Sequence, residues 1–557
     1  MDQAIVAASS RTSENPAATS LTNEVLSRIF YFAVELSVRT LRERVLQPEA
    51  NTDSFASTIN PPLLFLRVCR RWRDITLSTP ALWTSLVLQR SLTEPSERPY
   101  RKIEAKALAK WMANSGSHSL SLTILRDPRD NAVSTDADAR NLHGDLLTAF
   151  LLRCYDVHVV ERRAVVKRVV DTVKAAAGLT SLTLMVLEGG NTRSGWEDHP
   201  RINICKSIPP RLHQLSCFQT HLGSWEGINP VIMVDPPGTP CTRLRRLHLQ
   251  QPMPWNRLVR WIAYCRNLEL VDIPVGFPSA FMFKEIVTQN LPANSLAVCA
   301  DNLKELRLEL VTPTSTGIET DFEDMVGIVA PELNTLVLTL KKQIFSIDDF
   351  DWIIDDPNAT TLPILGGFAS RLGSSLSQLK SLTIINLENT TADDTIAFLL
   401  RLPQLQELTV NASLDRTQDV IRALTIGKPG GKRLGTEAVL PDVLCPVLQS
   451  LCFQKYHWSE DLQVDTIALV CSRWGVATTE QSNNPTVETI SASNAFSLKG
   501  EANRSQVLPL KRLTLQPCIE SRVLYPRPHT RLLAVDHPTI CLCVSKGFKL
   551  EGCTCSP

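Results

Sequence analysis

The sequence predicts an α/β protein in which a short helical module precedes an irregular solenoid of leucine repeats. Two amphipathic segments and an aromatic turn lie between residues 21 and 88, and the pattern L-x-x-L-x-L recurs behind them. A helical stretch and a short turn precede many of these repeats. Because one such unit cannot bury its own apolar side chains, we expect the units to stack, with a parallel sheet inside and helices outside.

The first helix of the module has a recognisable start. Thr22 is a suitable N-cap, and Glu24 in the first turn suits the positive end of the helix dipole. Apolar residues then recur at helical spacing and predict one apolar stripe. The residues of this stripe are Val25, Leu26, Ile29, Phe30 and Ala33.

A second helix is expected to begin after the two prolines at 61–62, since proline is tolerated in a first turn. Its apolar stripe consists of Leu64, Val68, Cys69 and Trp72. Thr79 and Pro80 predict the N-cap and first residue of a further helical turn that ends in Leu82 and Trp83. Because helices this short are unstable alone in water, the module either caps the repeats or docks on a partner.

This segment resembles an F-box, in the form that is common in fungal proteins. It differs from the usual pattern in two respects: Thr22 stands where proline is usual, and residues 35–60 form an insertion between the first two helices. The residues that carry the resemblance are Leu21, Glu24, Val25, Leu26, Ile29, Phe30, Leu64, Val68, Cys69, Arg70, Trp72, Arg73, Ile75, Ser78, Thr79, Pro80, Leu82 and Trp83.

The repeats behind the module resemble leucine-rich repeats, and an F-box followed by such repeats is a known family arrangement. Their spacing is irregular, from 24 residues between Leu244 and Leu268 to 62 residues between Leu448 and Leu510. We therefore expect a curved solenoid with insertions. The ten instances of L-x-x-L-x-L begin at Leu179, Leu212, Leu244, Leu268, Leu303, Leu333, Leu379, Leu405, Leu448 and Leu510.

These patterns divide the chain into five segments. The expected division is 1–20 as a flexible N-terminus, 21–88 as the F-box with its insertion at 35–60, 89–178 as a helical linker or first irregular repeats, 179–517 as the leucine-rich-repeat-like solenoid, and 518–557 as a C-terminal cap or tail. Within the third segment, residues 145–177 favour one long helix with a basic, solvated face. Cys154 and His158 would then lie one turn apart on that helix.

Alternation along each strand sends the repeat leucines inward and the residues between them to the opposite face. That face is either an ordinary strand exterior, for which threonine is well suited, or a binding surface for a protein or peptide. The candidate target-binding residues on it are Arg246, His248, Glu305, Arg307, Thr335, Thr383, Glu407 and Thr409.

Composition excludes several functional classes. The net charge of +1 gives no field that favours nucleic acid, and no apolar run reaches the roughly 20 residues of a membrane span. Fifteen scattered cysteines without an export signal favour reduced thiols in the cytoplasm, the nucleus or both. We expect no enzyme activity, cofactor or metal site, since no catalytic motif holds and the tail pairs Cys541/Cys543 and Cys553/Cys555 are spaced too closely for zinc.

The family resemblance implies a function. An F-box protein with leucine-rich repeats is expected to act as the substrate-recognition subunit of a Skp–cullin–F-box ubiquitin ligase. Its F-box would bind the Skp adaptor and, through it, the cullin, while the repeats hold an unknown target protein. The adaptor-binding residues would be Leu21, Glu24, Val25, Leu26, Ile29, Phe30, Leu64, Val68, Cys69, Trp72, Leu82 and Trp83. The alternative is a non-ligase leucine-rich-repeat scaffold whose helical N-terminus caps the solenoid.

Overall fold

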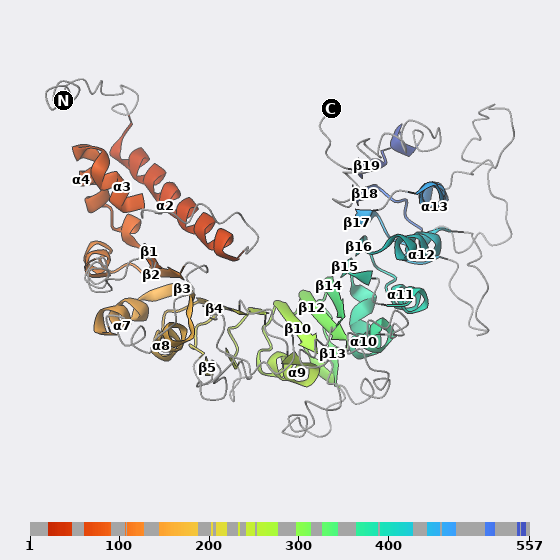
Figure 1. The fold of residues 1–557 in the computed structure, drawn as a ribbon, viewed down its shortest axis with the longest axis horizontal. Helices are drawn as coiled ribbons and strands as arrows, with labels where there is room; N and C mark the ends of the chain where they lie inside the picture. Colours follow the sequence, from red (N-terminus) through yellow and green to blue (C-terminus); the bar gives the residue numbers. More distant parts are fainter. Residues whose placement is uncertain are drawn as a thin grey trace, which may run out of the picture. The chain divides into compact units, whose positions relative to one another are not determined.

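The protein is an α/β structure of parallel strands flanked by helices (Figure 1). It is seen in a computed structural model. Two compact units are formed: Met1–Leu222 with Asn229–Val234 make unit 1, and Gly223–Ile228 with Asp235–Pro557 make unit 2. The expected solenoid 179–517 is therefore divided between two units. The residues described are 21–46, 61–90, 106, 108–126, 144–187, 202–203, 208–219, 232–233, 241–250, 253–276, 297–312, 326–342, 364–387, 390–426, 443–456, 459–474, 507–517, 543–545 and 547–552.

The sheet of unit 1 is parallel, with the strand order β1-β2-β3-β4-β6. Its strands are β1 (Ser85–Arg90), β2 (Leu120–Arg126), β3 (Cys154–Arg162), β4 (Ser181–Leu187) and β6 (Gln214–Gln219). One apolar residue from each strand lies in the same register row, and all five are buried because each is covered by its neighbours. The row is Leu86, Leu122, Val157, Leu182 and Leu215. A separate two-stranded sheet joins β5 (Ile202–Asn203) to β7 (Ile232–Met233).

Two helices pack on the sheet of unit 1. Helix α7 (Gly144–Leu152) contacts β2 and β3, and α8 (Arg163–Val173) contacts β3 and β4. The inner face of α8 is built from valines at helical spacing, which makes it strongly amphipathic. The buried residues of this face are Val165, Val166, Val169, Val170 and Val173.

The main sheet of unit 2 repeats the same parallel pattern. Its strands are β8 (Arg246–Leu249), β10 (Leu270–Gly276), β12 (Glu305–Thr312), β14 (Thr335–Lys342), β15 (Ser381–Ile385), β16 (Glu407–Asn411), β17 (Ser450–Tyr456), β18 (Arg512–Pro517) and β19 (Lys549–Gly552). Strand β9 (Met253–Pro254) also pairs with β10, and β11 (Ala297–Cys299) pairs with β13 (Gly327–Val329) in a small second sheet. One register row runs through Leu247, Val271, Leu306, Leu336, Leu382, Leu408, Leu451, Leu513 and Leu550.

A tight turn precedes most strands, at the short turn segments that the sequence predicts before the repeats. The amide of the first repeat leucine donates to the carbonyl three residues earlier, as in Leu303 N to Ala300 O at 3.1 Å and Leu333 N to Ala330 O at 3.2 Å. The same bond joins Leu405 to Leu402 at 3.3 Å. Each of these leucines is fully buried, so the turn satisfies backbone groups where no water can reach them.

The helices of unit 2 follow one another along one side of its strands (Figure 1). They are α9 (Trp255–Tyr264), α10 (Ile364–Leu372), the 3₁₀ helix η6 (Gly373–Gln378), α11 (Ala392–Leu399), α12 (Leu414–Leu424) and α13 (Glu460–Trp474). Polar side chains join neighbours: the Asp394 carboxylate accepts hydrogen bonds from Leu365 N at 2.8 Å and Gly366 N at 2.7 Å. This contact satisfies amides at the start of α10 with a side chain from α11.

The predicted long helix at 145–177 is wrong, because strand β3 occupies 154–162 between α7 and α8. Together with β2, this strand shows that the range 89–178, expected as a helical linker or first irregular repeats, contains two paired parallel strands. Valines recur in β3, and β-branched side chains favour a buried strand over a helix. Arg162 is buried, and Arg153 donates to the carbonyls of Gly116 and His118, so neither belongs to a solvated helix face.

In the segment expected as a C-terminal cap or tail, β19 pairs parallel with β18 and extends the sheet. Cys543 is buried, while Cys541, Cys553 and Cys555 lie outside the described residues. Across the described ranges, no group of three histidine, cysteine or acidic side chains is arranged to hold a metal ion. None of the described helices is both long and apolar enough to cross a membrane.

The register rows predict unequal costs for neighbouring residues on one strand. Leu338 is fully buried in β14, whereas Val337 points to the opposite face and is partly exposed. Leu338→Ala should reduce the free energy of unfolding by about 2–5 kcal/mol because it leaves a cavity. Val337→Ala should cost less than about 1.5 kcal/mol. Urea denaturation compares the two, and equal losses would contradict this packing.

Candidate interaction surfaces

Helix α2 (Asn23–Leu46) begins where the sequence predicts and continues much further. Val25 N donates to Thr22 Oγ1 at 3.4 Å, and Leu26 N donates to Thr22 O at 3.1 Å, as expected for an N-cap. Hydrogen bonds from its own backbone amide and from Thr22 lower the pKa of the Glu24 carboxyl. The expectation of a short first helix is wrong, since α2 has 24 residues and includes 35–46 of the supposed insertion. Residues 47–60 lie outside the described chain.

The inner face of α2 is buried at every fourth residue, at Leu26, Phe30, Val34 and Val38. Phe30 stacks on Phe65 with ring centroids 4.2 Å apart and lies 4.6 Å from the centroid of Trp72. Phe65 and Trp72 also meet edge to face at 6.0 Å. This aromatic cluster joins three helices, and such pairs contribute about 0.5–1.5 kcal/mol each beyond their area burial.

The second predicted helix is two helices, α3 (Pro61–Val68) and α4 (Arg70–Ser78). The break falls at Cys69, whose extended backbone (φ −156°, ψ 171°) cannot continue a helix. The Cys69 thiol accepts from Trp72 N at 3.5 Å, and Arg73 Nε donates to Leu66 O at 3.1 Å. These bonds partner the backbone groups that the interruption exposes.

The 3₁₀ helix η3 (Pro80–Trp83) confirms the turn predicted at Thr79 and Pro80. Trp83 is fully buried, donates from Nε1 to Thr76 O at 2.8 Å and packs edge to face on Trp111 at 4.8 Å. Leu82 is also fully buried. Of the predicted adaptor-binding residues, Leu26, Phe30, Leu82 and Trp83 therefore form the interior of the module and offer no surface to a partner.

Another set of apolar side chains on the module is uncovered by the described residues. Along α2 the exposed fractions are 42% for Val25, 47% for Ile29, 66% for Phe32 and 65% for Leu36. These spacings of four, three and four residues place them on one side of the helix. Leu64 and Val68 of α3 are exposed as well. We call these six residues the apolar surface; Phe32 and Leu36 were missed in the sequence, although they continue the period of Val25 and Ile29.

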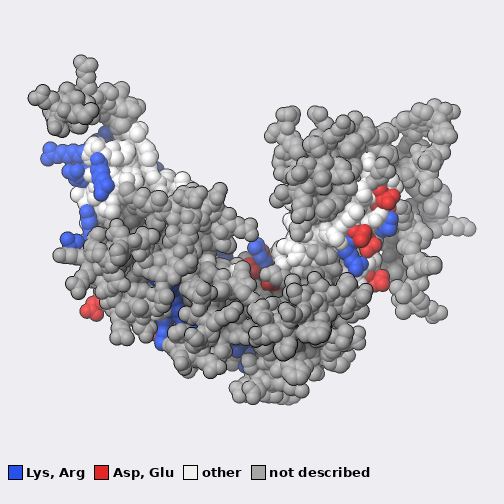
Figure 2. Space-filling model, viewed as in Figure 1, with Lys and Arg blue, Asp and Glu red and all other residues white. Residues whose placement is uncertain are grey.

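Basic side chains lie beside this surface. Arg67, Arg70 and Arg73 are exposed on α3 and α4, and Figure 2 shows basic side chains at the edge of an uncharged area on the helical module. Arg71 instead joins the helices, since its Nε donates to Asn23 Oδ1 at 3.1 Å and its guanidinium also bonds the carbonyl of Leu21. Leu21 and Glu24 thus stand at the edge of the module, where α2 begins.

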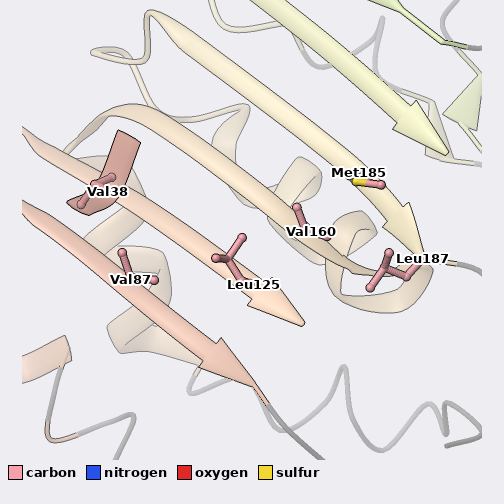
Figure 3. Packing of buried hydrophobic residues seen from close by; sticks show 6 residues of the cluster. All are labelled: Val38, Val87, Leu125, Val160, Met185 and Leu187. Atoms are coloured by element: carbon pink, nitrogen blue, oxygen red, sulfur yellow. The ribbon is translucent and has the colours of Figure 1, made fainter. Parts of the chain in front are cut away.

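The second half of α2 packs on the sheet of unit 1. Val38 and Leu41 pack with a cluster of side chains that project from strands β1 to β4, and Figure 3 shows Val38 beside the strands that carry Val87 and Leu125. Arg42 adds an ion pair to Asp156 at 2.6 Å and hydrogen bonds to Thr123 at 2.9 Å and Ser121 at 2.8 Å. The strand residues of the apolar cluster are Val87, Leu125, Val160, Met185 and Leu187.

His158 lies close to this contact on β3 and is buried, with no hydrogen-bond partner for Nε2 among the described residues. Burial and the positive charge of Arg42 lower the pKa of its imidazole to about 4, while Asp156 opposes the shift. The histidine is therefore neutral at physiological pH. His158 belongs to the buried interior of the sheet. Because residues 154–162 form a strand and not a helix, Cys154 and His158 do not lie one helical turn apart.

A second candidate surface lies on the strands of unit 2. The predicted target-binding residues all occupy two register rows that point away from the helices, and all are partly or fully exposed. The first row is Arg246, Leu270, Glu305, Thr335, Ser381, Glu407, Ser450, Arg512 and Lys549. The second is His248, Asp272, Arg307, Val337, Thr383, Thr409, Cys452, Thr514 and Glu551.

Charges on this strand surface gather toward its two ends. His248 Nδ1 lies 3.0 Å from Asp272, and Arg307 lies 2.6 Å from Glu305. At the other end Arg512 Nε lies 3.3 Å from Glu551. Figure 2 shows acidic and basic side chains side by side over the C-terminal strands. Between the ends the second row carries Val337, threonines and Cys452, which can contact an apolar or a polar ligand.

No protein-family model matches the chain, and no curated protein is similar to it in sequence. The features of the molecule that bear on function are the two surfaces and the sequence motif at the first of them. Both surfaces have the exposed apolar and mixed-charge character of binding surfaces.

His158 predicts a dependence of stability on acid. Because the folded-state pKa of about 4 lies below the ordinary value of 6.5, the unfolded chain takes up the proton first. The contribution of neutral His158 to the free energy of unfolding is complete above pH 6.5 and is lost as the pH falls toward 4. His158→Gln should therefore flatten the fall in the free energy of unfolding between these pH values. Urea denaturation of both proteins at several pH values measures it, and parallel curves would contradict the assignment.

Proposed function

We propose that this chain is the target-recognition subunit of a Skp–cullin–F-box ubiquitin ligase. The helical module would dock on the Skp adaptor, and the strand surface of unit 2 would bind a target protein. The main support for the proposal is that the F-box-like residues lie in a packed helical module whose apolar surface is not covered by any of the described residues. The fine assignment as an F-box with leucine-rich repeats is part of the proposal.

The apolar surface is suited to docking because of its composition and its place on regular helices. Phe32 and Leu36 are the most exposed of these residues, with exposed fractions of 66% and 65%. Burying such side chains on a partner contributes about 25 cal/mol for each Å² of apolar area. Their helix is held by Phe30 beneath them, so docking requires little ordering and loses little conformational entropy.

The exposure of each motif residue determines whether it could touch the adaptor. Val25, Ile29, Leu64 and Val68 would contact it directly, joined by Phe32 and Leu36. Leu26, Phe30, Leu82 and Trp83 would act indirectly by holding the helices in place. Such a subunit performs no chemistry; it raises the effective concentration of its target near the ubiquitin-carrying enzyme.

A second candidate function is a scaffold without ligase activity, in which the module only caps the repeats. The packing of Val38 and Arg42 on the sheet of unit 1 favours this reading, since it gives α2 a structural task of its own. The two functions are compatible in their geometry. They differ in whether the outer side of α2 has a partner.

The decisive experiment is co-purification of the full chain with a tagged Skp adaptor. Ile29→Asp combined with Phe32→Asp places two charges on the apolar surface and should reduce adaptor binding at least tenfold, because unpaired charges would be desolvated in the complex. The matched control is Val464→Asp on α13, a valine with 62% exposure far along the chain. The control should bind as the original chain does.

The urea midpoints of these variants separate docking from capping. The double variant should unfold at the same midpoint as the original chain, since both side chains point away from the core. If the original chain fails to co-purify with the adaptor, the proposal is wrong. Failure to bind the adaptor, with the urea midpoint of the double variant lowered, supports the capping scaffold instead.

A further inference from the structure

Two cysteines from separate repeats meet in unit 2. Cys241 precedes β8, and Cys265 directly follows helix α9. Their backbones are joined, because Cys241 N donates to Tyr264 O at 2.9 Å. Two further backbone hydrogen bonds hold Cys265. Its amide donates to Trp261 O at 2.9 Å, and its carbonyl accepts from Leu268 N at 3.0 Å. The pair is therefore placed by regular backbone structure on both sides.

The two thiols differ in their surroundings. Cys241 is partly exposed, whereas Cys265 is fully buried. The Cys241 sulfur lies within hydrogen-bonding reach of the Cys265 thiol and of the backbone amides of Arg243 and Leu244, and these donors lower its pKa to about 6. These donors therefore favour the thiolate of Cys241, which is the reactive form of cysteine, although burial acts in the opposite direction.

Other cysteines of the described chain have the opposite character. Burial raises the pKa of the Cys217 thiol, and it raises the pKa of Cys445 to about 12. Cys471 lies near the buried Cys543, and burial raises its pKa to about 12 as well. The Cys471/Cys543 pair is therefore an internal comparison, since burial disfavours the thiolate of Cys471.

We propose that Cys241 and Cys265 form a peroxide-sensitive dithiol, with Cys241 as the attacking thiolate and Cys265 as the resolving thiol. The Cys241 sulfur attacks one oxygen of hydrogen peroxide, the O–O bond breaks, and Cys241 sulfenic acid and hydroxide are formed. The Cys265 sulfur then attacks the Cys241 sulfur, the S–O bond breaks, and water leaves with the thiol proton. Two thiols lose two electrons in total, and one peroxide is reduced to water.

The resulting disulfide would tie the segment before β8 to the end of α9. This segment leads into Arg246 and His248, at one end of the strand surface. Oxidation would therefore fix the backbone from which these two side chains project. The proposal does not depend on the identity of the partner that binds there, nor on the ligase function.

The test uses the full, reduced chain carrying Cys217→Ser, because the tryptic peptide 212–243 otherwise contains Cys217 beside Cys241. The protein is treated with increasing hydrogen peroxide at pH 7, blocked with N-ethylmaleimide and digested without reduction. Mass spectrometry should find peptide 212–243 linked to peptide 261–266 at a peroxide concentration at least tenfold below that needed to link Cys471 to Cys543. Absence of this link, or equal sensitivity of both pairs, would overturn the proposal.

Two further measurements assign the roles of the sulfurs. Cys265→Ala should leave a sulfenic acid on Cys241 that dimedone traps, while Cys241→Ser should abolish both the trapped adduct and the link. Since Cys265 is buried and its replacement could disturb folding, the rate of Cys241 alkylation by iodoacetamide is also followed against pH with Cys265 present. A midpoint near pH 6 supports the thiolate, and a midpoint near the ordinary cysteine value of about 8.5 contradicts it.

Discussion

The constraint on which this structure depends is the shared register of neighbouring parallel strands. Each helix–turn–strand unit exposes apolar side chains until the next unit covers them, so burial is complete only along the rows. In unit 2, Leu306, Leu336 and Leu382 lie in one such row and are fully buried. A slip of one residue would turn these leucines outward and bring polar neighbours inward. The alternation thus determines the core and the opposite strand surface together.

Helix α2 of unit 1 has apolar side chains on two different sides. One side supplies Leu26 and Phe30 to the aromatic core, and further along it supplies Val38 to the strands. Another side carries Ile29 and Phe32 with no cover among the described residues. A helix that only capped the sheet would have no need of large apolar side chains on a second side, because exposed phenylalanine and leucine gain nothing from water. This apolar surface supports the proposal that a partner docks there.

Polar contacts in the core have a positioning role. Arg42 bonds Asp156 and two hydroxyl groups, and these contacts join the second half of α2 to strands β2 and β3. Asp394 performs a similar task between α10 and α11 through two backbone amides. Buried polar groups of this kind are costly when unpaired, so they favour one arrangement of helices over alternatives that apolar packing alone would permit. The contrast between Cys241 and Cys445 follows from the same rule, since nearby donors stabilise one thiolate and burial disfavours the other.

The sequence by itself determined the α/β class, the parallel repeats, the start of α2 at Thr22 and the turn at Pro80, because these depend on local spacing and on capping chemistry. It also placed the eight candidate target-binding residues on one face of the strands, since the alternation of side chains needs no tertiary information. Only the tertiary structure decided that Trp83 is interior while Phe32 is exposed, because helical periodicity gives the side of a helix but not what covers it. It likewise decided that 154–162 is a strand, because this valine-rich segment pairs with β2 on one side and β4 on the other. The meeting of Cys241 with Cys265 depends on the stacking of separate repeats, which no local pattern records.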